Sequence, residues 1–269
     1  DPSITSNTKF FQSLLTFGVA LPSFLTAFTI AASLEYAARK RGAKTWLDWM
    51  FKLPYFDKEN GLFGYLIMGM ILFIFGGLTG LVNASYQLNN MVHNTAWMPG
   101  HFHMTVAGPV FLGIIGMSMH MLAKATGKTI KFKNLYTMTP YLWTIGILTF
   151  STGMMWGGLM GEPRRTNLGL TYLNPESPMF RSEWVPTTEL ALWGGIIMTL
   201  AFTCYLISLI ATFFSKRVAE PSVAFPDTEV LHVEPKIRIL NNFRPWVITM
   251  VVVIVLSYGP ALYDIMKFT

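Results

Sequence analysis

The stretch NGLFGYLIMGMILFIFGGLTGLVNASYQLNNMVHNTAWMPGHFHMTVAGPVFLGIIGMSMHMLA, residues 60–123, contains no Asp, Glu, Lys or Arg. A helix that crosses a bilayer needs roughly 20 predominantly apolar residues, so this stretch is long enough for two spans. Its polar section from Asn83 to Gly100, which includes Pro99, predicts a turn between them. The stretch therefore predicts a membrane protein that crosses the bilayer more than once.

Four further charge-free stretches flank this one, at residues 10–34, 134–161, 190–215 and 245–263. Together they predict an all-α polytopic membrane protein with six transmembrane helices in a single membrane domain, residues 1–269. We expect the helices near residues 10–35, 61–86, 99–123, 138–161, 188–215 and 244–266. Aromatic residues and lysines between the first two predict an amphipathic segment on the membrane surface, near residues 44–53.

The composition excludes most other classes of protein. Of the 269 residues, 52% are hydrophobic and 13% are charged, and the mean hydropathy is +0.43. A soluble domain carries about 25% charged residues. The single cysteine, Cys204, excludes an internal disulfide and a cysteine-based metal site. The net charge of +6 comes from residues scattered between apolar runs, so we expect no nucleic-acid partner.

The Lys and Arg residues are distributed unevenly over the connections between the expected helices. Alternate sides of the membrane receive 15 and 5 of them, with the termini included. The positive-inside rule therefore places both termini on the outer side. The same count places the turn near His93 and the Arg164–Arg165 pair on that side.

Three histidines lie at the outer end of the third expected helix: His93, His101 and His103. Residues two apart on an α-helix point about 200° apart, so His101 and His103 suit two separate groups better than one metal ion. Haem fits this arrangement, because it is flat and apolar and its iron accepts an imidazole ligand. The alternative is a pair of structural histidines hydrogen-bonded to neighbours, although ionisable residues inside a span are usually functional.

Pro163-Arg164-Arg165 follows the fourth expected helix on the same outer side. Two adjacent guanidinium groups suit carboxylates, because each can bind one through two parallel hydrogen bonds. Haem propionates are carboxylates of this kind. The alternative is that both arginines extend to lipid headgroups, and the residues alone leave the two interpretations open.

A polar stripe follows the first expected helix, made of Ser23, Thr26, Thr29 and Ser33. Spacings of three and four residues keep these hydroxyls on one side of the helix. Together with water molecules, such hydroxyls can relay protons. Ser and Thr also bond to carbonyls of their own helix, and from the residues alone this packing role is favoured.

The third expected helix begins with a run that closely resembles the tenth helix of subunit I of the haem–copper oxidases, above all the B-type branch of bacteria and archaea. The run is Val92-His93-Asn94-Thr95-Ala96-Trp97-Met98-Pro99-Gly100-His101-Phe102-His103. The similarity continues along the whole chain, through Pro22-Ser23, Thr26-Ala27-Phe28-Thr29, Val82-Asn83-Ala84-Ser85, Pro163-Arg164-Arg165 and Tyr258-Gly259-Pro260. The His-x-His element alone is shared with nitric oxide reductases, whereas the full run together with the arginine pair is specific.

The resemblance implies a role for each motif residue. His101 would be the proximal ligand of a high-spin haem iron, and His103 would be an axial ligand of a low-spin haem iron. The other implied cofactor-binding residues are Arg164, Arg165, His93 and Trp97. A proton path from the cytoplasm would include Ser23, Thr26 and Thr29.

The resemblance also implies cofactors and partners. We expect two haems, and a copper beside the high-spin haem whose ligands lie on another chain. The chain resembles helices eight to thirteen of the family, so the expected partners are an N-terminal part of subunit I with helices one to seven, a subunit II and small membrane subunits. Cytochrome c, a small copper protein or a quinol would donate electrons, and O2 would accept them.

The implied activity is that of a respiratory terminal oxidase, which reduces O2 to water with proton translocation. Its expected location is the plasma membrane of a bacterium or archaeon. Two departures stand out: Asn89 replaces an Asp of the B-type pattern, and Asn94 replaces an Asp that helps bind a divalent ion in the mitochondrial-type branch. We therefore expect no divalent-ion site at Asn94.

Two alternatives remain from the sequence. A nitric oxide reductase would carry iron beside the high-spin haem, and the ligands that distinguish it lie outside this chain. A haem-free membrane transporter or scaffold subunit would explain six spans, but it would not explain paired histidines and paired arginines on one side.

Overall fold

A computed structural model describes residues 4–164, 174–221 and 242–267 of the chain. Within these ranges the regular elements are helical, and the only β-pairing is an isolated bridge between Thr95 and Pro163. The prediction of an all-α protein is confirmed. The elements are α1 (Ser6–Lys40), η1 (Asp48–Lys52), α2 (Leu62–Ala84), α3 (Tyr86–Val92), α4 (Trp97–Phe102), η2 (His103–Ala107), α5 (Pro109–Thr126), α6 (Lys133–Leu159), η4 (Ser182–Trp184), α7 (Val185–Phe213) and α8 (Phe243–Lys267).

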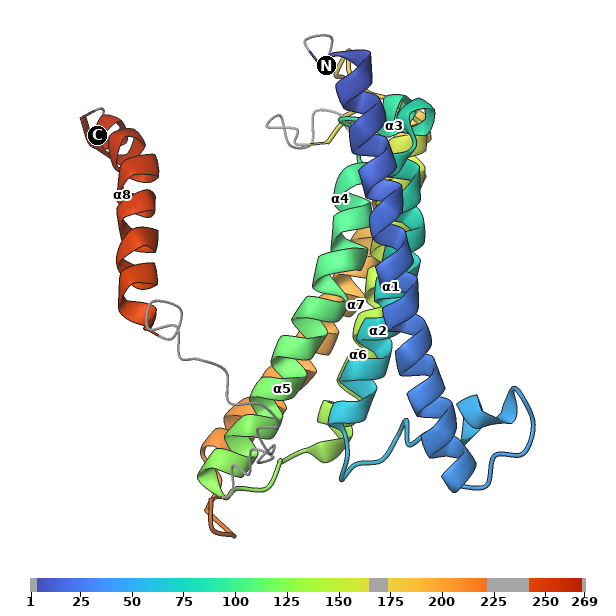
Figure 1. Ribbon diagram of the computed structural model, residues 1–269, viewed down its shortest axis with the longest axis vertical. Helices are drawn as coiled ribbons and strands as arrows, with labels where there is room; N and C mark the ends of the chain where they lie inside the picture. The colour runs from blue at the N-terminus through green and yellow to red at the C-terminus, as the bar shows by residue number, and fades with distance from the viewer. Residues whose placement is uncertain (1–3, 165–173, 222–241, 268–269) are drawn as a thin grey trace. The chain divides into compact units, whose positions relative to one another are not determined.

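The chain divides into two units, Asp1–Val223 and Ala224–Thr269. In the first, α1, α2, α6 and α7 run lengthwise beside α4 and α5 (Figure 1). The N-terminal end of α1 lies at the same end of this unit as α3 and the start of α4, and η1 lies at the opposite end (Figure 1). The described part of the second unit is the single helix α8.

The predicted count of six transmembrane helices is not exact. Among the described residues, four helical segments are both long and apolar enough to cross a membrane: Ser6–Lys40, Leu62–Ala84, Trp97–Thr126 and Ser182–Phe213. The helix α6 has sufficient length but is more polar, because hydroxyl residues such as Thr139 and Ser151 lie along it, fully buried. In α8 the apolar part that can be assessed, Arg244–Leu256, is shorter than a span.

The third expected helix, 99–123, is not continuous. The short α4 gives way to a π-helical turn, η2, and a new helix, α5, begins at Pro109. Proline lacks a backbone N–H and its ring crowds the carbonyl four residues earlier, which disfavours a regular α-helix through Pro109. The predicted turn before this helix contains one more helix, α3.

The segment expected to lie on the membrane surface, 44–53, contains the five-residue 3-10 helix η1. Trp46 and Phe51 are largely exposed, whereas Trp49 packs towards Leu53. Asp48 closes the turn before η1 by accepting the backbone N–H of Lys44, and this bond lowers the pKa of the Asp48 carboxyl.

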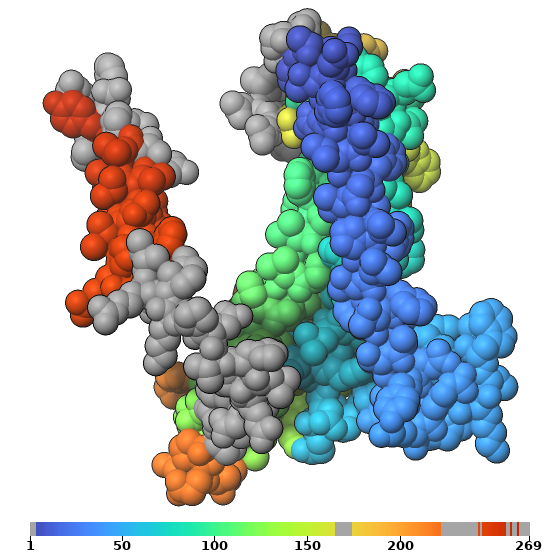
Figure 2. All heavy atoms as spheres, in the orientation of Figure 1, coloured from blue at the N-terminus to red at the C-terminus, as the bar shows by residue number. Residues whose placement is uncertain are grey.

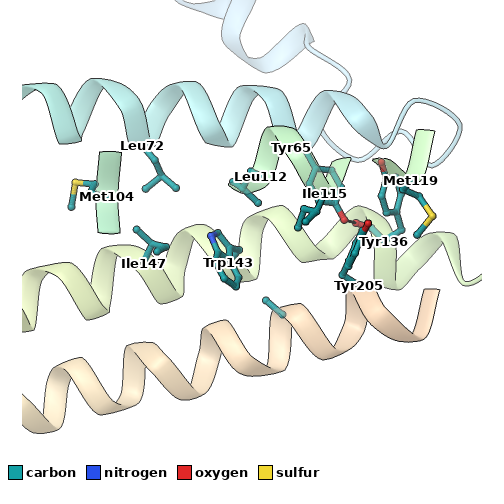
Figure 3. Close-up of a cluster of buried hydrophobic side chains, with 11 residues drawn as sticks. Tyr65, Leu72, Met104, Leu112, Ile115, Met119, Tyr136, Trp143, Ile147 and Tyr205 are labelled. Atoms are coloured by element: carbon teal, nitrogen blue, oxygen red, sulfur yellow. Dashed lines mark hydrogen bonds between the residues drawn. The ribbon is translucent and has the colours of Figure 1, made fainter. Parts of the chain in front are cut away.

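A cluster of buried side chains joins α2, α5, α6 and α7 (Figure 3). Its fully buried members include Tyr65, Leu72, Leu112, Met119 and Ile147. Figure 3 shows the side chains of this cluster in a row between the helices. Lipid is as apolar as these side chains, so close packing, rather than escape from water, provides most of the attraction between helices.

Glycines allow α6 and α7, the two helices with the most extensive mutual contact, to approach each other closely. A Cβ added at Gly194 would overlap the backbone of Phe150, and one at Gly153 would lie 2.6 Å from the backbone nitrogen of Ala191. Small residues at such crossings let the backbones make van der Waals contact. By contrast, α1 has only Ala38 buried, and its side chains stand on the surface of the first unit (Figure 2). An apolar helix exposed in this way is typical of one surrounded by lipid or by further helices.

Candidate functional site

The segment before the paired histidines is fastened to the connection after α6. The N–H of Ala96 donates to the carbonyl of Glu162 at 2.8 Å, and the N–H of Arg164 donates to the carbonyl of Asn94 at 3.1 Å. The Arg164 guanidinium also donates to Asn94 Oδ1 at 2.8 Å. Asn94 has a φ of +62°, a conformation that Asn adopts more readily than most residues. The structure thus brings Arg164 to the start of the helix that carries His101.

His101 is oriented by a hydroxyl on α2. Its Nδ1 lies 2.9 Å from Thr79 Oγ1, and the Thr79 hydroxyl lies 2.8 Å from the carbonyl of Gly76. The carbonyl can only accept, so it takes the single hydroxyl proton, and Nδ1–H of His101 donates to the hydroxyl oxygen. In the neutral imidazole, the opposite nitrogen, Nε2, then keeps its lone pair. Hydrogen bonding of one imidazole nitrogen in this way fixes the tautomer that binds metals through the other.

Nδ1 of His103 also has a hydrogen-bond partner, but the partner is a backbone carbonyl rather than a hydroxyl. Its Nδ1 lies 2.6 Å from the carbonyl of Pro99, which is an acceptor, so Nδ1 carries the proton and Nε2 keeps the lone pair. The ring lies 4.8 Å from the ring of Phe150 on α6, between centroids. His101 therefore contacts α2 while His103 contacts α6, so the structure directs the two imidazoles to different sides of the helix.

Each imidazole lines a separate cavity. His101 lines a cavity of about 370 Å³ between α1, α2 and α4, together with Ser23, Gly77 and Phe102. No atom lies within 4 Å of a Cβ built on Gly77, so the glycine leaves a flat wall there. His103 lines an apolar groove of about 480 Å³ along η2 and α5. An imidazole nitrogen beside an apolar cavity wall suits an apolar, metal-bearing group such as haem.

Trp97 and His93 occupy the end of the site near Arg164. Trp97 is buried, and its Nε1–H has no hydrogen-bond acceptor among the described residues. A buried donor of this kind fits an anionic ligand, because leaving it unpaired is costly. His93 is exposed and lines a polar cavity of about 270 Å³ with Asn83 and Asn89. Arg165, the other predicted propionate ligand, lies outside the described residues.

The predicted hydroxyl stripe is bonded within its own helix. Ser23, Thr26 and Thr29 each donate to the carbonyl four residues earlier, at 3.0, 2.9 and 2.8 Å. Ser23 also lines the cavity beside His101, whereas Thr26 and Thr29 are exposed. The three oxygens retain lone pairs that can accept a proton from water, so a relay along this face needs water molecules to donate to them.

The structure adds residues that the sequence analysis did not select. Thr79 orients His101, and Glu162 lies partly buried, two residues before Arg164. Burial raises the pKa of the Glu162 carboxyl, and hydrogen bonds from the hydroxyls of Thr188 and Thr187 oppose this shift. The position of Glu162 next to Pro163-Arg164 was the available signal, whereas nothing in the sequence places Thr79 against His101.

No group of three or more His, Cys, Asp or Glu side chains that could hold a metal ion occurs within residues 4–164, 174–221 and 242–267. Each imidazole of the pair therefore offers a single ligand. This donor set suits a metal that brings most of its own ligands, as the iron of a haem does.

By its fold the chain is a multi-pass helical membrane protein. Residues 3–197 match the family described as "Cytochrome C and Quinol oxidase polypeptide I", and the chain belongs to this family. The family resemblance seen in the sequence is thereby confirmed.

Curated relatives and a solved structure agree with this assignment. The chain is 35% identical to cytochrome c oxidase subunit 1 of Thermus thermophilus, over 98% of this chain and 47% of the relative. It is 30% identical to heme-copper oxidase subunit I+III of Aeropyrum pernix, over 54% of this chain and 17% of the relative. A heme-copper terminal oxidase dimer solved by cryo-EM matches with a TM-score of 0.79 and 44% identity, over 98% of this chain and 46% of that chain. The chain thus spans about half the length of the two relatives that it matches along nearly its whole length.

Replacing Thr79 with valine should weaken the site at His101 selectively. Valine keeps the shape of threonine but removes the oxygen that accepts Nδ1–H, so the imidazole loses its fixed orientation. Loss of such an outer partner lowers metal affinity by about 10–100-fold. Haem retention at each site, measured by spectroscopy during dilution of the complex, checks this. Thr149→Val is the matched control, because the exposed Thr149 hydroxyl bonds only to its own helix; equal losses in both variants would contradict the prediction.

Proposed function

We propose that this chain is part of the catalytic subunit I of a respiratory terminal oxidase. The observation that carries the proposal is the surroundings of the two imidazoles. Nδ1 of His101 and Nδ1 of His103 each lie within hydrogen-bond distance of an oxygen, and the two rings line separate cavities. In the neutral imidazole this arrangement leaves the Nε2 lone pair for a metal. Membership of the oxidase family supports a terminal oxidase role. The reaction we propose is the reduction of O2 to water with proton translocation.

His101 would hold the iron of a high-spin haem and His103 the iron of a low-spin haem. The bound metals would supply electron transfer and O–O bond cleavage, with copper beside the high-spin haem and its ligands on another chain. The chain's own residues orient the imidazoles through Thr79 and Pro99. Arg164, with Arg165 and the Nε1–H of Trp97, would bind the haem propionates, and His93 would face them.

Protons would enter along the hydroxyl face of α1. In this proposal Ser23, nearest to the cavity at His101, passes protons received through Thr26 and Thr29 with water between the hydroxyls. On the opposite end of the bundle, His93 and the arginine pair would lie on the exit side. Asn89 cannot exchange a proton, so any proton held near it would reside on His93 or on a propionate.

Other chains would complete the enzyme. The partners are an N-terminal part of subunit I with helices one to seven, a subunit II and small membrane subunits. The electron donor would be cytochrome c, a small copper protein or a quinol. The complex would lie in the plasma membrane of a bacterium or archaeon, with both termini of this chain outside.

The test is a reduced-minus-oxidised absorption spectrum of the complex purified through this chain, followed by addition of carbon monoxide. Two haem signals, of which carbon monoxide shifts only one, support the proposal. A flat spectrum from an intact complex would contradict it and would leave the histidine pair with a structural role in a transporter or scaffold.

Replacing Thr26 with valine should slow O2 reduction and leave the haem spectrum unchanged. The variant removes one oxygen that accepts a proton from water on the α1 face but keeps the shape of the side chain. Removal of a positioned proton-transfer group costs about 10²–10⁴-fold where proton transfer limits the rate. Turnover measured by O2 consumption checks this, with Thr249→Val on α8 as control, because the exposed Thr249 hydroxyl also donates to the carbonyl four residues earlier. Unchanged turnover would contradict a role in proton transfer and would leave these hydroxyls with a packing role.

A further inference from the structure

The connection that leaves α6 carries a carboxylate that the proposed function does not use. Glu162 Oε1 lies 3.2 Å from the hydroxyl of Thr188, and Oε2 lies 3.5 Å from the hydroxyl of Thr187. The same hydroxyls lie 2.9 and 2.8 Å from the carbonyl of Trp184, so each hydroxyl proton is shared between that carbonyl and the carboxylate. Both threonines belong to the first turn of α7, where the N-terminal end of the helix favours a nearby negative charge. No Lys or Arg among the described residues lies within ion-pair distance of Glu162. The carboxylate is therefore bound by hydroxyls and a helix end.

A glycine provides the space for this carboxylate. A Cβ added at Gly157, in the last turns of α6, would overlap Glu162 Oε2 and lie 3.0 Å from the hydroxyl oxygen of Thr187. The N–H of Glu162 donates to the carbonyl of Gly157 at 2.9 Å, so the chain folds back over the end of α6. The side chain of Glu162 is thus enclosed between the end of α6 and the start of α7.

The backbone of Glu162 contacts the segment that precedes the histidine pair. The carbonyl of Glu162 accepts the N–H of Ala96 at 2.8 Å. Two residues later, Arg164 donates its N–H to the carbonyl of Asn94 and its guanidinium to Asn94 Oδ1. Glu162 is therefore the point at which α6, α7 and the segment before α4 are joined.

We propose that Glu162 is a positioning residue: its carboxylate fastens the connection after α6 to the first turn of α7, and so holds Arg164 against Asn94 beside the histidine pair. The contacts of Glu162 lie within this chain and do not depend on the proposed function. The role of Arg164 in binding a haem propionate rests on the proposed function.

Hydrogen–deuterium exchange of the purified complex tests the fastening directly. Glu162→Ala should speed exchange of the amides of Ala96 and Arg164 by about tenfold or more, because bonds to a charged group are lost and the connection opens. Glu162→Gln keeps an acceptor oxygen and should restore most of the protection. Glu183→Gln, an exposed control in η4 on the same connection, should match the wild type. Unchanged exchange in Glu162→Ala would overturn the proposal.

A second measurement asks whether Glu162 acts through Arg164. The haem midpoint potentials should shift in Glu162→Ala and in Arg164→Ala, and the double variant should shift no further than Arg164→Ala alone. Additive shifts would overturn action through Arg164. Should Glu162→Ala fail to assemble, Thr188→Val removes one donor to the carboxylate and should speed exchange at the same two amides. Absence of haem from the wild-type complex would contradict the proposed function while leaving the exchange result decisive for Glu162.

Discussion

Replacing His103 with leucine in the complex that contains this chain should abolish the low-spin haem signal and leave the carbon monoxide-sensitive signal largely intact. Leucine fills the same space in the apolar groove but offers no lone pair to iron. His101 should be little affected, because its partner is Thr79 on α2, whereas His103 lies against Phe150 on α6. The reduced-minus-oxidised spectrum, recorded before and after addition of carbon monoxide, measures both signals at once.

The matched control is His120→Leu. His120 lies on α5, and it is absent from the residues that line the two cavities beside the histidine pair. This variant should keep both signals. Retention of the low-spin signal in His103→Leu would show that another residue holds that iron, and it would remove His103 from the site.

The different orientations of His101 and His103 could be predicted from helical pitch alone. Two residues along an α-helix correspond to about 200° of rotation, and the structure does direct the two rings to different neighbours. The π-helical turn that starts at His103 could not be predicted in the same way. Pro109 signals a break, but the place where the backbone widens depends on packing, since Thr105 of η2 fits against Gly76 of α2.

The partners of the site residues were harder to predict than the residues themselves. Thr79 lies 22 positions from His101, and Asn94 lies 70 positions from Arg164. Such pairs form only when the helices pack, and a single sequence carries no periodicity that reveals them. Glu162 shows the same limit, because its hydroxyl partners belong to α7.

Two sequence signals for a membrane span, absence of charge and high hydropathy, disagree at α6. Absence of charge predicts a span at α6, but α6 is not among the four described segments that are long and apolar enough to cross a membrane. The polar groups of α6 are buried against neighbouring helices, where hydroxyls bond to backbone carbonyls; Thr139, for example, donates to the carbonyl of Leu135. Hydropathy measures the mean polarity of a helix, whereas a single charged residue is already costly in lipid. A helix without charges that packs among other helices can therefore carry buried hydroxyls that lower its mean hydropathy.

Replacing Gly158 with alanine should destabilise the complex and lower both haem signals together. A Cβ at this position of α6 would overlap the backbone nitrogen of Trp97, so α4 must move away from α6. Overpacking of this kind costs about 1–3 kcal/mol. Alanine is also favoured over glycine inside a helix by about 1 kcal/mol, so the two effects oppose each other. We expect the steric effect to win, because the clash involves backbone atoms that no rotamer change can relieve.

Gly113→Ala separates these two effects. Gly113 lies within α5, and nothing lies within 4 Å of a Cβ built on it, so only the gain in helix propensity remains. The thermal midpoint of the solubilised complex should therefore rise slightly in Gly113→Ala and fall in Gly158→Ala. A rise in both variants would show that α4 can move away from α6 at little cost. In that case the position of the histidine pair would depend on Thr79 and on the bonds at Glu162 more than on the glycine contact.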